Sequence, residues 1–247
     1  MSEKIWLLKR CDLFQRLPPE ALTKLELRCR ARKFPRGSPI YLPADEADGA
    51  LLLTSGRAKI CSFSIDGKQA ILALIEPGEL FGELAVLGQD VREEYAEAAE
   101  KSSVLLIPAD AIQTLMTDYP DVSIGITKLF GFRRRRVERR LKYLLFRSNR
   151  QRLIHLLLEL TEQYGRPTAA GVDLGIKLSH QELANIIGST RETVTVVLGE
   201  LQAEGSLEVG RRKIVIRDLE GLAKSVQVPT PSLPGSDSLR QTDRGKF

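Results

Sequence analysis

The stretch SHQELANIIGSTRETVTVVLGELQAE, residues 179–204, decides the fold of the C-terminal part of the chain. Ser179 is followed three residues later by Glu182, which is the capping-box spacing that starts a helix. Gly188 ends this helix, because a residue without a side chain closes a tight turn at low cost. Ser189 or Thr190 then caps a second helix. The apolar residues of the two helices fall on inward faces, namely Leu183, Ile186 and Ile187, then Val194, Val197, Leu198 and Leu201. Two short helices joined by a glycine turn predict a helix-turn-helix.

The first turn of the second helix carries side chains that can read base pairs. Arg191, Glu192 and Thr195 fall on its exposed leading side. An arginine can bridge both acceptors of guanine, a glutamate can accept from the cytosine amino group, and a threonine methyl can pack on thymine. The alternative interpretation is that Arg191 and Glu192 form a surface ion pair on an ordinary helix.

Other residues around this motif are suited to phosphate oxygens. Ser179, His180 and Gln181 combine hydroxyl, ring and amide groups with the free N–H groups of a helix N-terminus. Downstream, SLEVGRRKIVIRD, residues 206–218, predicts a hairpin whose tip would touch the DNA backbone as a wing. The expected DNA-contacting set is therefore completed by Ser189, Thr190, Arg211 and Arg212.

The N-terminal half has the pattern of many short strands. Apolar runs of strand length are closed by Gly, Pro or Asp-Gly, namely PIYL (39–42), ALLLTSGRAKICSFSI (50–65), AILALIEPG (70–78) and SSVLLIP (102–108). Asp66-Gly67 is a two-residue hairpin signal for a type I′ turn. Strands at such near-regular intervals predict a β-barrel or double-sheet roll.

After Pro108 the chain is predicted to be helical, with a long helix over 121–145. Ile126, Phe130, Val137 and Leu144 follow a near seven-residue repeat along it, which favours a partner helix in a dimer. Packing on the surface of the chain's own barrel is the alternative. We expect an α+β fold with an N-terminal β-roll (1–117), a dimerisation helix (118–146), a C-terminal winged helix-turn-helix (147–224) and a disordered tail (225–247).

Charge is concentrated in one segment. Residues 133–150 contain eight arginines and one lysine against the single Glu138, whereas the whole chain carries only +5, so the remainder is slightly acidic. Such a segment indicates a polyanion partner, although a solvated helix face has the same composition.

Composition excludes several other classes. No stretch reaches the roughly 18 apolar residues of a membrane span, and charges interrupt the N-terminal segment where a signal peptide needs an apolar run. We expect a cytoplasmic protein without membrane contact. Cys11, Cys29 and Cys61 are widely spaced and the chain has only two histidines, so we expect no metal site. The sequence has no catalytic triad, no phosphate-binding loop and no usable pair of carboxylates, so we do not expect an enzyme.

The helix-turn-helix with its basic hairpin resembles that of the CRP/FNR family of bacterial transcription regulators. PGELFGELAVLG (77–88), Arg92 and the strand ending SSVLLIP are similar to the family's cyclic-nucleotide-binding roll. The resemblance covers about residues 7 to 220 and implies a sensor roll, a dimerisation helix and a DNA-binding domain in that order. Double-stranded DNA, a second copy of the chain and RNA polymerase are the partners it implies.

The resemblance also suggests an effector site at Gly82, Glu83, Leu84 and Arg92. In relatives that bind cyclic AMP, the arginine is followed by Ser or Thr. Here Glu93 and Glu94 follow, and these carboxylates would repel a phosphate or pair with Arg92. Val137 and Glu138 stand where such relatives place hydroxyls for the adenine. We expect cyclic AMP to bind weakly or not at all, and the effector is left open.

The cysteine and histidine content argues against the other known sensors of the family. An iron–sulfur cluster would need four cysteines, and the expected roll has no histidine for a His-ligated haem. In the recognition helix, Val196 replaces a second base-reading arginine that is common in the family, so the half-site should differ from the usual ones.

The sequence is compatible with two functions. One is a homodimeric, sequence-specific regulator on a palindromic operator. The other is a small-molecule-binding module that acts through protein partners rather than DNA.

Overall fold

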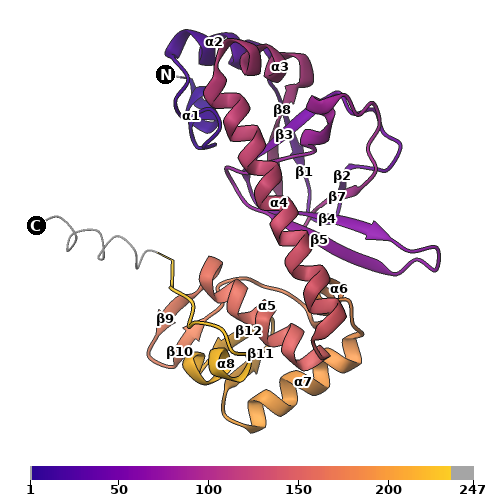
Figure 1. The fold of residues 1–247 in the computed structure, drawn as a ribbon, viewed down its shortest axis with the longest axis vertical. Coiled ribbons are helices and arrows are strands. Elements are labelled where there is room, and N and C mark those ends of the chain that lie inside the picture. Colours follow the sequence, from indigo (N-terminus) through magenta and orange to yellow (C-terminus); the bar gives the residue numbers. More distant parts are fainter. Residues whose placement is uncertain (1, 235–247) are drawn as a thin grey trace, which may run out of the picture. The chain divides into compact units, whose positions relative to one another are not determined.

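The structure is a computed structural model that describes residues 2–234. The chain divides by its internal contacts into two compact units, Met1–Val137 and Glu138–Phe247, and Figure 1 shows their elements. A long helix, α4 (Pro120–Phe146), contributes residues to both units.

The first unit is a roll of two antiparallel four-stranded sheets. One sheet has the order β1 (Arg30–Phe34), β8 (Ser102–Pro108), β3 (Gly49–Ser55) and β6 (Leu80–Phe81). The other has the order β2 (Pro39–Tyr41), β7 (Tyr95–Ala98), β4 (Ala58–Phe63) and β5 (Gln69–Ile75). The helical elements of this unit are α1 (Glu3–Lys9), α2 (Pro19–Arg28), the short 3-10 helix η1 (Glu83–Leu87), α3 (Ala109–Asp118) and the first part of α4.

Two hydrophobic cores hold the roll together. One core joins the inner faces of the two sheets and includes Leu53, Ile60 and Phe81. The other joins β3 and β8 to the helices and includes Leu22, Leu105 and Ile126 among others. Ile126 therefore ties the beginning of α4 to the roll.

The hairpin between β4 and β5 differs from the predicted type I′ turn. The strands end at Phe63 and resume at Gln69, and the Gly67 N–H donates to the Ser64 carbonyl at 2.9 Å. Gly67 has φ +74°, but Asp66 has no positive φ, and a type I′ turn requires both. The prediction of turn type was wrong because a longer loop with one left-handed glycine closes the hairpin.

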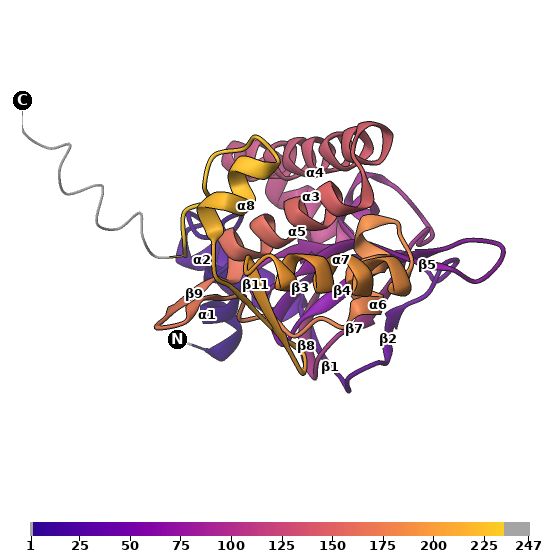
Figure 2. The ribbon, with the colours of Figure 1, turned by 90° about the horizontal axis from the view of Figure 1, so that it is seen from below.

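The second unit combines helices with a four-stranded antiparallel sheet. Its helices are α5 (Asn149–Tyr164), α6 (His180–Ile187), α7 (Arg191–Ala203) and α8 (Leu219–Ser225). The sheet order is β11 (Leu207–Gly210), β12 (Lys213–Ile216), β10 (Gly171–Asp173) and β9 (Arg166–Thr168). Figures 1 and 2 show α6 and α7 side by side, with α5 next to them. The predicted α+β class, with a roll, a long helix and a winged helix-turn-helix, is confirmed.

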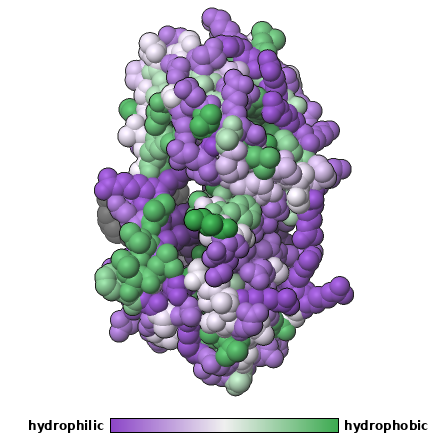
Figure 3. All heavy atoms as spheres, turned by 90° about the vertical axis from the view of Figure 1, so that its right-hand side faces the viewer, coloured by the Kyte–Doolittle hydropathy of each residue, from purple (hydrophilic) through white to green (hydrophobic). Residues whose placement is uncertain are grey.

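The disordered tail was predicted to begin at Ser225, and this boundary was wrong, because Ser225 is the last residue of α8 and Val226 is buried within the second unit. Residues 235–247 lie outside the described part of the chain. Within residues 2–234, no helix is long and apolar enough to cross a bilayer. On the face shown in Figure 3 the surface is mostly hydrophilic, and hydrophobic side chains gather in separate patches.

The close packing of β3 against β8 leaves no room for a side chain at Gly49. A Cβ at this position would lie 2.1 Å from the Ile107 carbonyl oxygen, which is backbone and cannot rotate away. We expect Gly49→Ala to lower the free energy of unfolding of the roll by about 3 kcal/mol or more, measured by denaturant unfolding. Gly131→Ala in α4 is the control, because open space surrounds that position and alanine is favoured in a helix. Equal effects of the two changes would contradict the proposed clash.

Candidate functional site

The start of α6 has the predicted capping box. The Ser179 hydroxyl accepts from the Glu182 N–H at 3.2 Å, and the Glu182 carboxylate accepts from the Ser179 N–H at 2.8 Å and from its hydroxyl at 2.7 Å. These bonds confirm the cap. They also occupy the one hydroxyl proton of Ser179, so this hydroxyl has no donor to offer to a phosphate.

The turn between α6 and α7 is made by Gly188, as predicted. Gly188 has φ +65°, and a Cβ there would lie 3.1 Å from Cδ2 of Leu144. Of the two proposed caps for α7, Thr190 is the one used, because its hydroxyl accepts from the Thr193 N–H at 3.2 Å. Ser189 is half-buried in the turn. The first residue of α7 is consequently Arg191.

The first turn of α7 presents charged groups to solvent. Arg191, Glu192 and Thr195 are exposed, whereas Val194 and Leu198 are buried beneath them. The pKa of Glu192 is lowered, first by its own backbone N–H and then by the Thr190 hydroxyl, so it stays a charged acceptor at neutral pH. In the described part of the chain no ion pair within 4 Å joins Arg191 to Glu192, although the positive charge of Arg191 also helps to lower the pKa of Glu192.

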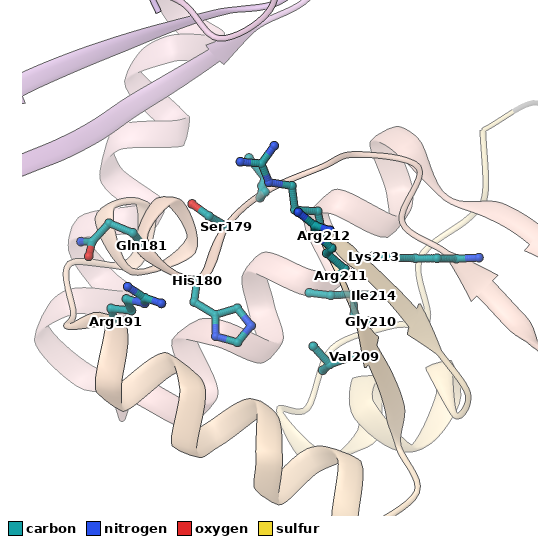
Figure 4. A pocket seen from close by; sticks show the side chains of 11 residues that line it. Ser179, His180, Gln181, Arg191, Val209, Gly210, Arg211, Arg212, Lys213 and Ile214 are labelled. Carbon is teal, nitrogen blue, oxygen red and sulfur yellow. The ribbon is translucent and has the colours of Figure 1, made fainter.

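A groove of about 390 Å³ lies between the helix-turn-helix and the hairpin. Figure 4 shows its lining, to which the start of α6, Arg191 and the hairpin tip contribute. Gly210 of β11 pairs with Lys213 of β12 at the end of the hairpin. The two residues between them, Arg211 and Arg212, form its exposed tip. Lys213 also lines the groove, and its ammonium group forms an ion pair with Asp173 at 3.3 Å.

Arg212 has φ +55°, a left-handed conformation that costs a residue with a Cβ about 1 kcal/mol or more. Glycine would fit this turn better than arginine does. An arginine in this position is consistent with a role for its charge rather than with a stability requirement.

Two of the other predicted phosphate contacts have partners within the protein. Gln181 donates to the Asn185 side chain at 2.8 Å. Nδ1 of His180 lies 2.8 Å from the Thr195 hydroxyl, which in turn donates to the Arg191 carbonyl at 2.9 Å. This link between α6 and α7 was not foreseen from the sequence, because the two side chains are fifteen positions apart.

In the roll, Arg92 is bound by the protein itself. Its side chain donates to the carbonyls of Gly82 at 2.7 Å and Gly49 at 2.5 Å, and it lies 3.7 Å from the Asp48 carboxylate. It is 6% exposed, and its guanidinium carbon lies over the ring of Tyr41, 4.8 Å from the ring centroid. The expectation that Glu93 or Glu94 would pair with Arg92 was wrong, because Asp48 is its partner carboxylate.

The remaining predicted effector residues lie around the same loop. Gly82 caps η1 in a left-handed conformation, Glu83 is buried and Leu84 is half-buried. Arg133 of α4 forms an ion pair with Glu83 and donates to the Leu80 carbonyl at 2.6 Å. The role of Arg133 was not visible in the sequence, where it belonged to a run of four arginines.

Glu94 adds a second carboxyl group to this cluster. It accepts from the Tyr41 hydroxyl at 3.4 Å. Its pKa is raised, mainly by burial and next by the charge of Glu83. Glu94 is half-buried and the charge of Glu83 already disfavours its ionised form, so this pair of carboxyl groups does not favour an added anionic ligand.

The stripe predicted along α4 exists, but its two halves have different environments. Ile126 is 2% exposed in the core of the roll and Phe130 packs partly against the same core, so the alternative of packing on the chain's own roll holds for them. Val137, 64% exposed, and Leu144 lie further along the same helix face in contact with solvent. Ile126 has no free surface for a second chain and was wrongly assigned to the interface.

Two family models match the chain. A cyclic nucleotide-binding domain matches residues 31–119, and a Crp-like helix-turn-helix domain matches residues 151–225. Similarity to known proteins extends over most of the chain. The Cyclic AMP receptor protein of Thermus thermophilus is 30% identical over 85% of this chain and 94% of its own length. The transcriptional regulator SdrP of the same organism is 34% identical over 76% of this chain and 90% of its own length.

Solved structures agree with this result. A CRP/FNR-family transcriptional regulator from Thermus thermophilus matches with a TM-score of 0.65 and 31% identity, over 80% of this chain and 98% of that one. The family models and the named relatives describe regulators of transcription rather than enzymes. The chain belongs to the CRP/FNR family of transcription regulators.

Proposed function

We propose that the chain is a homodimeric, sequence-specific regulator that binds a palindromic operator through the groove between α6, α7 and the β11–β12 hairpin. The observation that carries this proposal is the position of Arg191. It is the first residue of a capped helix, it is exposed, and it lines the same groove as the basic hairpin tip. A helix that presents its N-terminal residues beside a basic hairpin fits docking into a major groove with phosphate contacts at its edge.

Base reading is assigned to the first turn of α7. Arg191 and Glu192 together suit a G·C base pair, because a guanidinium can bridge guanine and a carboxylate can accept from cytosine. The Thr195 hydroxyl is already bonded within the protein. Its methyl group is then the part that remains for contact with thymine. Val196, the residue after Thr195, is exposed as well. Its side chain is apolar, so it can contact DNA but cannot form a hydrogen bond with a base.

The hairpin tip is assigned to the phosphate backbone together with the start of α6. Arg211 and Arg212 are exposed cations that no described acid pairs with. RNA polymerase as a further partner, and a cytoplasmic location, are carried over from the family as part of the same proposal.

Selection of operators from a random duplex library tests the base-reading assignment. Arg191→Ala should cost about 1–3 kcal/mol on the selected operator and relax the preference at one base pair of each half-site. Arg212→Gly is the control, because it removes a charge while relieving a left-handed arginine. It should weaken all sequences alike, and the dependence of log K on log salt should become shallower by roughly one unit.

The assignment fails if Arg191→Ala keeps the sequence preference of the unchanged protein. Retention of all duplexes alike, lost when salt is raised, would indicate phosphate contacts only. Absence of any DNA retention would instead favour the function through protein partners.

The dimer is assigned to the second half of α4. Val137, Leu141 and Leu144 are more than half exposed, and their spacing of four and three residues puts them on one helix face. This face continues the stripe that begins with Ile126 and Phe130 on the roll. Exposed apolar side chains in such a row are typical of a coiled-coil seam.

Val137→Lys combined with Leu141→Lys should give monomers in sedimentation, because two cations per helix would then face each other in an already arginine-rich segment. Operator affinity should fall as well, since a monomer forfeits the linked second half-site. Lys142→Ala on the opposite face of α4 is the control and should leave the dimer intact. A doubly substituted protein that still sediments as a dimer would move the interface elsewhere.

We further propose that cyclic AMP is not the effector of this chain. To hold a cyclic phosphate, Arg92 would have to release two carbonyl oxygens and Asp48. The ligand would also enter a cluster that contains Glu83 and the reluctantly ionised Glu94. The internal bonds of Arg92 are charge-assisted, so replacing them with bonds to a phosphate would gain little free energy.

Titration calorimetry with the full chain checks this point. We expect no saturable heat on addition of cyclic AMP at micromolar concentrations. Saturable micromolar binding would show that Arg92 exchanges its internal partners for phosphate, and the proposal would then be wrong.

A further inference from the structure

The hydrogen bonds around Thr195 determine which ring nitrogen of His180 carries a proton. The Thr195 hydroxyl has one proton, and it lies 2.9 Å from the Arg191 carbonyl, which can only accept. The same hydroxyl lies 2.8 Å from Nδ1 of His180. Both bonds can form together only when the hydroxyl donates to the carbonyl and Nδ1–H donates to the threonine oxygen, and we assign this tautomer to His180. In the neutral ring, Nε2 is then an acceptor without a proton.

The ring lines the groove to which DNA binding is assigned above. Figure 4 shows His180 in the groove between Arg191 on α7 and Val209 on the hairpin. A phosphate oxygen is an acceptor too, so it is repelled by a bare Nε2 and attracted by a protonated one. The same side chain therefore opposes phosphate binding when neutral and favours it when charged.

The charged groups near the ring come from each element that lines the groove. On α6, the Glu182 carboxylate is held by Ser179. On α7, Arg191 lines the groove with the ring, and Glu192 is the next residue of the first turn. On the hairpin, Arg211 and Arg212 face solvent, and the charge of Lys213 is paired with Asp173.

We propose that His180 is a proton-linked phosphate contact, so that DNA binding takes up a proton at Nε2 and strengthens as the pH falls. In this step the ring takes up one proton from solvent at Nε2 and becomes an imidazolium. It then donates through Nδ1–H to Thr195 and through Nε2–H to a phosphate oxygen. The phosphates of bound DNA favour the charged ring, which is why uptake accompanies binding. This inference rests on the proposed function and adds a regulation to it.

Fluorescence anisotropy with the full chain and a labelled duplex of the selected operator tests the inference. Binding is measured at about pH 6 and about pH 8 at constant ionic strength, because histidine changes its charge between them. For one linked proton we expect affinity to fall roughly three- to tenfold from the lower to the higher pH.

Two variants separate charge from shape at this position. His180→Arg should bind tightly at both pH values, because its charge does not titrate in this range. His180→Gln should bind at both values about as weakly as the unchanged protein does at the higher one. Both variants keep His155, the other histidine of the chain, so a pH dependence that survives in them belongs elsewhere.

The inference is overturned if the unchanged protein binds equally at both pH values, or if His180→Gln keeps the full pH dependence. Either result would leave the proposed DNA-binding function standing. Absence of duplex binding by all three proteins at both pH values would overturn the proposed function together with this inference. Long-range proton–nitrogen NMR on the free protein gives an independent reading, since the geometry requires a proton on Nδ1 of His180 at the higher pH.

Discussion

The left-handed turn at Gly188 is the constraint on which the DNA-binding surface depends. It joins two helices that are each capped by a hydroxyl residue, and it has little room for a larger side chain because Leu144 lies beside it. This turn fixes where α7 begins, and the Thr190 cap then makes Arg191 its first residue. The exposure of Arg191 and Glu192 follows from burial of Val194 and Leu198 on the opposite side of the helix.

The roll shows the reverse situation, in which charged groups are bound by the protein itself. Arg92 is held by two carbonyls and Asp48, and Glu83 is held by Arg133 from α4. Buried charges require such partners, because an unpaired charge in a protein interior is costly. A family fold has thus been retained while the charged groups at its ligand site pair with groups of the same chain, although Nε of Arg92 and Oε2 of Glu83 have no hydrogen-bond partner among the described residues. This observation separates membership of the family from the identity of the effector.

Local patterns predicted the fold well, and contacts between distant residues account for most of the errors. Capping boxes, a glycine turn and strand-length apolar runs depend on neighbours in the chain, so the winged helix-turn-helix and the roll were predicted correctly. Ile126 was misassigned because a helical stripe does not reveal which surface covers it. The partner of Arg92 was missed for the same reason, since Asp48 lies 44 positions away along the chain. The use of the Ser179 hydroxyl in its own cap shows that one residue type can serve two roles, and only geometry decides between them.

The DNA-binding surface can be located by hydrogen–deuterium exchange of the full chain, with and without duplex DNA that carries the selected operator. We expect DNA to slow exchange at the start of α6, in the first turn of α7 and at the tip of the β11–β12 hairpin. Protection confined to the arginine-rich part of α4, with exchange in those three segments unchanged, would contradict this expectation.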